Sequence, residues 1–366
     1  MCIRDSQPTA YKGSTTTIQR QGFARLNSDG TVDSTFDPEP SGPVSSILIQ
    51  PDGNILIGGT FSSFSQNQAV INQQLASKGV SVVTGNGQAT VSFTTINSSF
   101  PGYSNITGYV VTANSGSAVV STNSNTTSPV VVTGLTNGQT YNYVVTAVLK
   151  STVAANLARI KSSDGSLDTN FQPNPSGPVT SIVYEPQKLA QSTATHDQLI
   201  IAGDFTSITP AGFKTTITTM ASYIARIDAT DGSVDTSFQP NPNGIVETLA
   251  LQPNGQILLG GVFSTLTPNP TTKTTVSGST VTTVTTQPTK RQGIARLNTD
   301  GTLDTNFDPE PNGVVLSIGV NQNNGQIVVG GIFTSIAGSS RNNVARLNSS
   351  GSIDNGFNVS LNGIVD

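Results

Sequence analysis

Short apolar runs alternate with clusters of Gly, Pro, Asn and Asp along most of this 366-residue chain, and helical periodicity is nearly absent. Such runs predict β-strands bounded by tight turns. Two motifs recur in a fixed order. The first is typified by ARLNTDGTLDTNF, which begins at Ala295, and the second by a Gly-x-Val segment, a polar turn and a run such as IVVGGIF, which begins at Ile327. The chain is therefore predicted to be an all-β repeat protein.

Each repeat is expected to hold four strands. The first follows Gly-x-Val, the second carries paired glycines, the third carries Ala-Arg-Leu-Asn, and the fourth is short. The recurring arginine is spaced by 50 residues between Arg296 and Arg346, about the size of one β-propeller blade. We therefore expect about four and a half four-stranded blades in an incomplete ring. The innermost strands are expected to carry Val44, Val179, Ile245 and Val314.

Extra length falls mainly between the second and third strands of a repeat, and the longest insertion, 78–149, has the features of a separate β-sandwich. Over Val80–Val148 it resembles the fibronectin type III family. Phe93 stands where that family has a core tryptophan, and Leu135 with Tyr141 matches its tyrosine corner, in which the phenol bonds a nearby backbone group. Few residues remain after Val148, so the seventh strand is expected to be short or missing.

The repeats themselves resemble the delta-sixty repeat, a bacterial β-propeller family without a settled activity. The resemblance covers Gly22–Gln66 and Ala155–Asp366 and implies a propeller. The expected organisation is a discontinuous propeller, 11–70 and 150–366, interrupted by the insertion at 78–149.

Both ends of the chain are expected to be truncated. Met1–Ser6 reads MCIRDS, which resembles a translated sequencing adapter, so 1–10 are expected to be a non-native start and loop. At the other end the chain stops inside a further Gly-x-Val segment, Gly363–Val365. No signal peptide is visible at the N-terminus.

The turn between the third and fourth strands brings an arginine opposite an aspartate in every repeat. An Asn-x-Asp-Gly turn places residues on its two sides in register, so the arginine and the aspartate are directly opposed. An arginine between packed sheets needs an acidic partner. We interpret these pairs as structural: Arg25–Asp33, Arg159–Asp168, Arg226–Asp235, Arg296–Asp304 and Arg346–Asp354.

Two other interpretations of the repeated residues are weaker. The Asn-x-Asp-Gly-x-x-Asp turn resembles an oxygen-rich calcium loop, but Lys161 replaces the first ligand position in one repeat and Ser350 the third in another. The paired glycines are followed by no helix and no lysine, so they do not form a phosphate-binding loop. We expect no metal and no other cofactor.

The sequence offers little material for catalysis. His196 is the only histidine, and it lies in an expanded turn between a first and a second strand, so we expect neither a His-based triad nor a His metal cluster. Most acidic residues occupy repeated structural positions. Asp204, which replaces a strand glycine, and Glu247 are the one plausible pair of carboxylates for a glycosidase, which needs two flanking one bond.

Composition narrows the function further. Only 10% of residues are charged, the net charge is −4, and no basic stripe is present, so nucleic-acid binding is disfavoured. No apolar run reaches the roughly 18 residues of a membrane span. Cys2 is the single cysteine, so an intrachain disulfide is impossible.

The expected function is a non-enzymatic binding or scaffold module of an exported or cell-surface bacterial protein. The expected partner is an unknown protein or glycan, bound at the face that carries the insertions between second and third strands, because loops on a rigid scaffold usually carry binding. The alternative is a carbohydrate-active propeller enzyme that uses channel carboxylates. These insertions are the fibronectin-like domain, Thr206–Tyr223 and Ser264–Arg291. A further alternative is that the insertions have no partner.

Overall fold

The computed structural model describes residues 2–3, 22–33, 36, 38–64, 79–95, 106–149, 152–163, 165–189, 196–210, 219–268, 272–277 and 280–366. These residues form strands and turns and no helix, so no helix there could cross a membrane. The chain divides into two compact units. One comprises Met1–Pro43, Ser62–Ala154 and Ile160–Asp168, and the other comprises Val44–Phe61, Ala155–Arg159 and Thr169–Asp366. The segment 4–21, with the expected N-terminal loop, lies outside the described residues.

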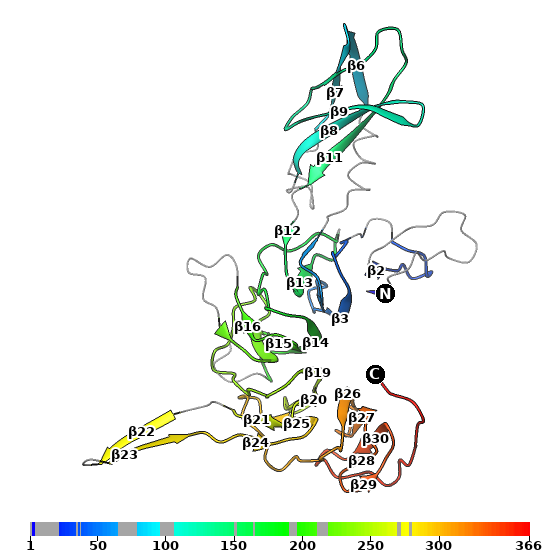
Figure 1. Cartoon of the computed structure of the whole chain (residues 1–366). Coiled ribbons are helices and arrows are strands. Elements are labelled where there is room, and N and C mark those ends of the chain that lie inside the picture. Colours follow the sequence, from blue (N-terminus) through cyan, green and yellow to red (C-terminus); the bar gives the residue numbers. More distant parts are fainter. Residues whose placement is uncertain are drawn as a thin grey trace. The chain divides into compact units, whose positions relative to one another are not determined.

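Four three-stranded antiparallel sheets recur along the second unit (Figure 1), in the orders β3-β4-β13, β14-β15-β18, β19-β20-β25 and β26-β27-β30. In each sheet the strand with the glycines is central, and most of its residues are buried. The strands are β3 (Val44–Ile49), β4 (Ile55–Gly59), β13 (Leu157–Ile160), β14 (Val179–Glu185), β15 (Gln198–Gly203), β18 (Ile224–Asp228), β19 (Val246–Leu251), β20 (Ile257–Gly261), β25 (Ile294–Leu297), β26 (Val314–Val320), β27 (Ile327–Ile332) and β30 (Val344–Leu347).

Consecutive sheets pack through their first strands, because β14 contacts both β3 and β19, and β19 contacts β26. The first glycine of a central strand makes room for the valine of the next repeat. A Cβ at Gly260 would lie 2.7 Å from Val315 Cγ1, and one at Gly330 would lie 2.5 Å from Val365 Cγ1. Glycine in these strands therefore marks close approach of the neighbouring repeat. Of the four residues expected on innermost strands, Ile245 lies one residue before β19 and the other three lie in strands.

The fourth strand of each repeat is shorter than expected. Where four strands were predicted, the structure has three strands and a single bridging residue. The aspartate opposite the arginine explains this difference: Asn306 N donates to Asp304 Oδ1 at 3.0 Å, which bends the chain out of the sheet two residues later. The bridges are Leu26 with Val32, Ile160 with Leu167, Ile227 with Val234, Leu297 with Leu303, and Leu347 with Ile353.

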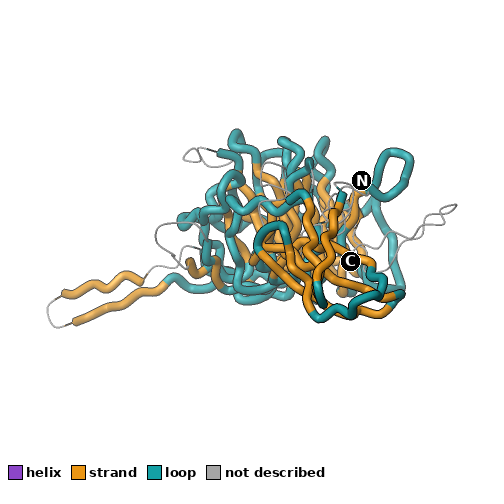
Figure 2. The backbone as a smooth tube through the Cα atoms, turned by 90° about the horizontal axis from the view of Figure 1, so that it is seen from above, coloured by secondary structure: helices purple, strands orange, loops and turns teal. Residues whose placement is uncertain are grey.

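Each insertion between the second and third strands starts from a two-residue antiparallel ribbon, which we call an insertion root. In the last repeat the root is closed by the turn Ala337-Gly338. In the preceding repeat it continues into a hairpin, β22 (Thr272–Ser277) and β23 (Thr280–Thr285), which extends away from its sheet in Figures 1 and 2. The roots are β5 (Ser63–Phe64) with β12 (Thr152–Val153), β16 (Ser207–Ile208) with β17 (Thr219–Met220), β21 (Thr265–Leu266) with β24 (Thr289–Lys290), and β28 (Ser335–Ile336) with β29 (Ser339–Ser340).

The longest insertion folds around its own core. Two three-stranded sheets, β10-β7-β6 and β11-β8-β9, enclose a cluster of buried side chains that includes Phe93 and Tyr109, whose ring centroids are 4.9 Å apart. Tyr141 Oη accepts a hydrogen bond of 2.9 Å from Thr136 N. The described residues contain six strands of this domain: β6 (Val80–Gly85), β7 (Gln88–Phe93), β8 (Ile106–Ser115), β9 (Ala118–Asn125), β10 (Val130–Thr133) and β11 (Asn142–Leu149).

The first repeat motif forms a small separate cluster in the first unit. There β1 (Cys2–Ile3) pairs with β2 (Ala24–Arg25). Phe23 and Phe36 are fully buried, with their ring centroids 5.5 Å apart in an edge-to-face arrangement.

Candidate functional site

Four of the five arginine–aspartate pairs lie within hydrogen-bonding distance in the structure. Arg296 Nη2 is 2.8 Å from Asp304 Oδ2, and both side chains are nearly buried, at 10% and 12% exposed. Burial opposes ionisation of Asp304, but the hydrogen bonds from Arg296 and Asn306 outweigh it and lower the pKa of the carboxyl. The other three pairs have shortest distances of 2.9 Å for Arg25–Asp33, 2.7 Å for Arg226–Asp235 and 2.7 Å for Arg346–Asp354.

Two of these arginines, Arg226 and Arg296, also join neighbouring repeats. Arg226 Nη1 donates to Thr299 O at 2.6 Å, a carbonyl in the turn of the next repeat. Arg296 Nη1 likewise donates to Ser349 O, and its guanidinium lies 4.4 Å from the ring centroid of Phe307. With an acid, a carbonyl and a ring around each guanidinium, these side chains serve packing between repeats.

The remaining pair, Arg159–Asp168, stays a prediction, because its two residues belong to different units. Both side chains are buried, at 8% and 9% exposed. Arg159 donates to Ala229 O at 2.6 Å and to Thr230 O at 2.8 Å, both in the turn of the next repeat, and its guanidinium lies 4.7 Å from the centroid of Phe171.

The turn carboxylates considered for calcium bond within their own turns. Asp300 Oδ1 accepts from Thr302 N at 2.9 Å and from Thr302 Oγ1 at 2.5 Å. Asp29 makes the equivalent two bonds to Thr31. In the part of the chain that the structure describes, no three His, Cys, Asp or Glu side chains are grouped to hold a metal ion.

Asp204 and Glu247 lie close enough to influence each other. Burial raises the pKa of the Glu247 carboxyl, and the charge of Asp204 raises it further. Asp204 is exposed directly after β15, and Glu247 lies where the pairing of β19 with β20 shifts register. The structure therefore places Asp204 near enough to Glu247 for its charge to act on that carboxyl.

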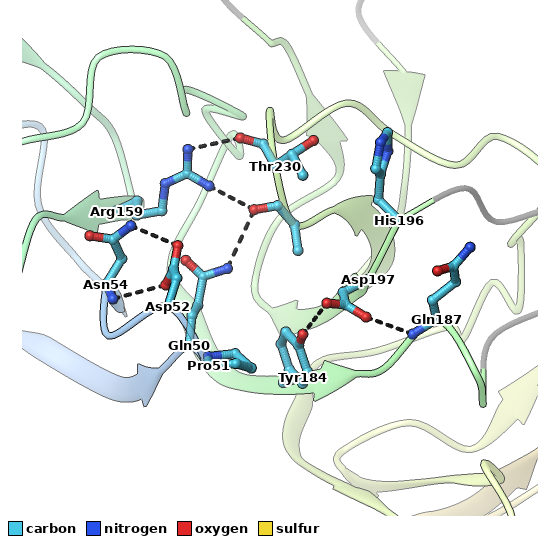
Figure 3. A pocket seen from close by; sticks show the side chains of 11 residues that line it. Gln50, Pro51, Asp52, Asn54, Arg159, Tyr184, Gln187, His196, Asp197 and Thr230 are labelled. Carbon is cyan, nitrogen blue, oxygen red and sulfur yellow. Dashed lines mark hydrogen bonds between the residues drawn. The ribbon is translucent and has the colours of Figure 1, made fainter.

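A polar cavity of about 470 Å³ opens between the first two repeats of the second unit (Figure 3). It is formed by the turns that join first and second strands, together with the turn after β18, and not by the insertions. Sequence reasoning missed it, although the expansion of one such turn, Glu185–Gln198, was a visible signal. Its lining residues are Gln50, Pro51, Asp52, Asn54, Arg159, Tyr184, Gln187, His196, Asp197, Ala229 and Thr230.

Hydrogen bonds fix most of the side chains around this cavity. The Tyr184 hydroxyl donates to Asp197 Oδ2, and Gln187 N donates to Asp197 Oδ1 at 2.8 Å. Burial, followed by that bond to Asp197, raises the pKa of Tyr184 to about 12. His196 Nδ1 lies 3.0 Å from Asp228 Oδ2 while its ring stays half exposed. The only histidine of the chain therefore contacts an acid at the rim of this cavity.

Glu185 is a buried acid that the sequence did not single out. Its side chain is fully buried, both carboxyl oxygens lack a hydrogen-bond partner, and Arg226 Nη1 is 3.6 Å from Oε2. Burial raises the pKa of Glu185 to about 7, against the opposing effect of Arg226. The corresponding residues of the flanking repeats are Gln50 and Gln252, also buried. A neutral side chain is therefore usual at this position.

Glu185→Gln is expected to stabilise the protein at pH 8. The folded protein holds the Glu185 proton up to about pH 7, whereas the unfolded chain releases it near pH 4.5. The stabilisation from protonated Glu185 is therefore complete below pH 4.5 and is lost as the pH rises to about 7. The total loss in the free energy of unfolding is at most about 3 kcal/mol. Urea midpoints of wild type and variant should diverge across that window. Gln252→Glu should introduce the same pH-dependent loss, and parallel curves for all three proteins would contradict the assignment.

Comparison with known families agrees with the repeated sheets. The family model of a beta-propeller domain of unknown function, DUF5122, matches residues 13–36, 50–71, 275–307 and 322–357. Three of these stretches contain an arginine–aspartate hairpin described above. No curated protein and no solved structure matches the chain. The chain is thus an all-β repeat protein, and it is similar to a beta-propeller domain.

Proposed function

We propose that the protein is a non-enzymatic binding and scaffold module, exported or displayed at the surface of a bacterial cell. The proposal includes a propeller of the delta-sixty repeat type with a fibronectin type III-like insertion. Tyr141 bonded to the backbone of Thr136, and Phe93 in the core between two sheets, support the second part.

The proposal rests on a contrast within each repeat between the recurring charged residues, which hold the sheets together, and the insertions, which vary. The recurring charged side chains are used between and within repeats, as Arg296 is with Asp304 and Ser349. Variation is concentrated beyond the insertion roots, where one repeat carries a two-residue turn and another a hairpin. Rigid elements that present variable loops are the usual architecture of a binding protein. The partner is a protein or a glycan that meets these insertions.

The proposal is tested by removing insertions at their roots. In one variant, 267–288 is replaced by Ala-Gly, the turn that closes β28 and β29. In a second, 65–151 is replaced in the same way. Both should fold, and binding to a glycan array or to intact cells should fall in at least one of them. If both variants fold and bind like wild type, the insertions are not the recognition surface.

The enzyme alternative is retained because of one observation, the raised pKa of Glu247 beside Asp204. A carboxyl whose pKa is raised by burial and by a neighbouring acid can serve as a general acid. Release of reducing sugar from a polysaccharide, lost in Glu247→Gln, would favour this second function.

A further inference from the structure

Strand β6, at the edge of the insertion domain, is exposed along its whole length. All six residues, Val80–Gly85, are exposed, and Val80, Val82 and Val83 have exposed fractions of 39%, 39% and 70%. Among the described residues, the strand pairs with β7 alone, in the sheet order β10-β7-β6. Because no described strand pairs with its outer edge, the backbone N–H and C=O groups there form a template on which another strand can add.

Two of the exposed valines point toward the core side of the sheet. Val80 is paired with Phe93 and Val82 with Val91, and those partners are 8% and 0% exposed. Because directly opposed residues lie on the same face of a sheet, Val80 and Val82 continue the apolar core face. They remain exposed because no described residue of the second sheet covers them.

The opposite side of the domain is closed. Ser121 Oγ on β9 donates to Thr133 O on β10 at 2.7 Å, and Thr133 N donates to Asn123 Oδ1 at 3.3 Å. Among the described residues, no hydrogen bond joins β6 to the other sheet. Hydrogen bonds thus join the two sheets along one side of the domain, and none between described residues joins them along the side of β6.

Charge does not protect this edge. Residues Val80–Leu149 contain no Asp, Glu, Lys, Arg or His. Soluble proteins usually block edge strands with charges, prolines or bulges, and the pairing of β6 with β7 has neither a proline nor a register shift. A second copy of this uncharged edge would meet no electrostatic repulsion, whereas a charged partner would have to lose hydration against a surface with no counter-charge.

We propose that β6 is a self-association edge, at which two copies of the chain pair antiparallel, β6 to β6. An antiparallel edge is complementary to itself about a two-fold axis. With Val82 on that axis, Ser81 of each copy lies opposite the partner's Val83, and Val80 opposite the partner's Thr84. Two three-stranded sheets then become one six-stranded sheet, and the core-side valines of both copies cover each other across the junction.

Paired charges on the outer face of β6 test the proposal. Ser81 and Val83 lie on the face away from the core, so substitutions there should leave the fold intact. In S81K/V83K, each lysine would oppose a lysine of the partner, and dimerisation of the full chain should weaken by about tenfold or more. In S81E/V83K, each lysine would oppose a glutamate, so the dimer should persist at low salt and weaken as salt is added.

The control is V131K/T133K, which adds the same two charges to the outer face of β10, at the other edge of the sheet, and should dimerise like wild type. Sedimentation velocity from about 1 to 100 µM measures each protein. A monomeric wild type, or equal association of S81K/V83K and S81E/V83K, overturns the proposal. As an independent check, Val82→Cys in a Cys2→Ser chain should form a disulfide-linked dimer on oxidation, whereas Val131→Cys should not; failure of Val82→Cys to cross-link excludes the proposed register.

Discussion

Gly313→Ala is expected to be among the most destabilising single substitutions in this protein, by more than about 3 kcal/mol. A Cβ at Gly313 would lie 1.9 Å from the carbonyl oxygen of Ile332, a backbone atom of the central strand in the same sheet. Backbone cannot move aside as a flexible side chain can, so the strand pair itself would have to separate. The urea midpoint, followed by circular dichroism, measures the loss.

The chain supplies a matched control for this substitution. Gly363 occupies the corresponding place in the final Gly-x-Val segment, and a Cβ there would have nothing within 4 Å. Gly363→Ala should change stability by no more than about 0.5 kcal/mol. Equal effects of the two substitutions would show that strand contact is not the reason for glycine at this position.

Arg296→Ala should cost about 3–5 kcal/mol, the range for breaking a buried ion pair. The substitution leaves Asp304 without its charged partner, while Gln256 Nε2 at 3.2 Å offers it only a neutral donor. It also removes the bond to Ser349 O and the contact with the Phe307 ring. Both the local hairpin and the junction with the next repeat are weakened, so the urea midpoint should fall.

Arg346→Ala is the control for the junction contribution. Arg346 bonds Asp354 at 2.7 Å but is 31% exposed, and among the described residues its guanidinium has no carbonyl acceptor in a following repeat. Its loss should cost about 1 kcal/mol or less, as for a largely solvated pair. If Arg346→Ala is as damaging as Arg296→Ala, the contact between repeats adds little and the local hairpin dominates.

The sequence predicted the repeated elements well because their signals are local. An apolar run before Gly-Gly gave the central strands, and Asn-x-Asp-Gly gave the register that places Leu297 opposite Leu303. The fourth strand was overestimated. The Asp304 side chain bonds the backbone at Asn306 and ends the pairing, and a sequence pattern does not reveal such competition between side chain and backbone.

Contacts between repeats were the harder part. The pairing of Arg226 with Asp235 follows from turn register, but its bond to Thr299 O requires the placement of the next sheet. The sequence did not single out Glu185, because its burial depends on the packing of the expanded turn that follows it. Comparison of Glu185 with Gln50 and Gln252 at the corresponding positions could have revealed it.

The insertion roots also lower the energetic cost of gaining or losing an insertion during evolution. From Phe61 to Arg159 the chain runs 98 residues, and from Phe333 to Arg346 it runs 13. Because each root already holds its two ends at hairpin distance, the added closure entropy grows only as the logarithm of length, about 2 kcal/mol between these extremes. A domain with neighbouring termini can therefore be acquired at a root in a single genetic event at small energetic cost, and lost again without disturbing the sheet beneath it.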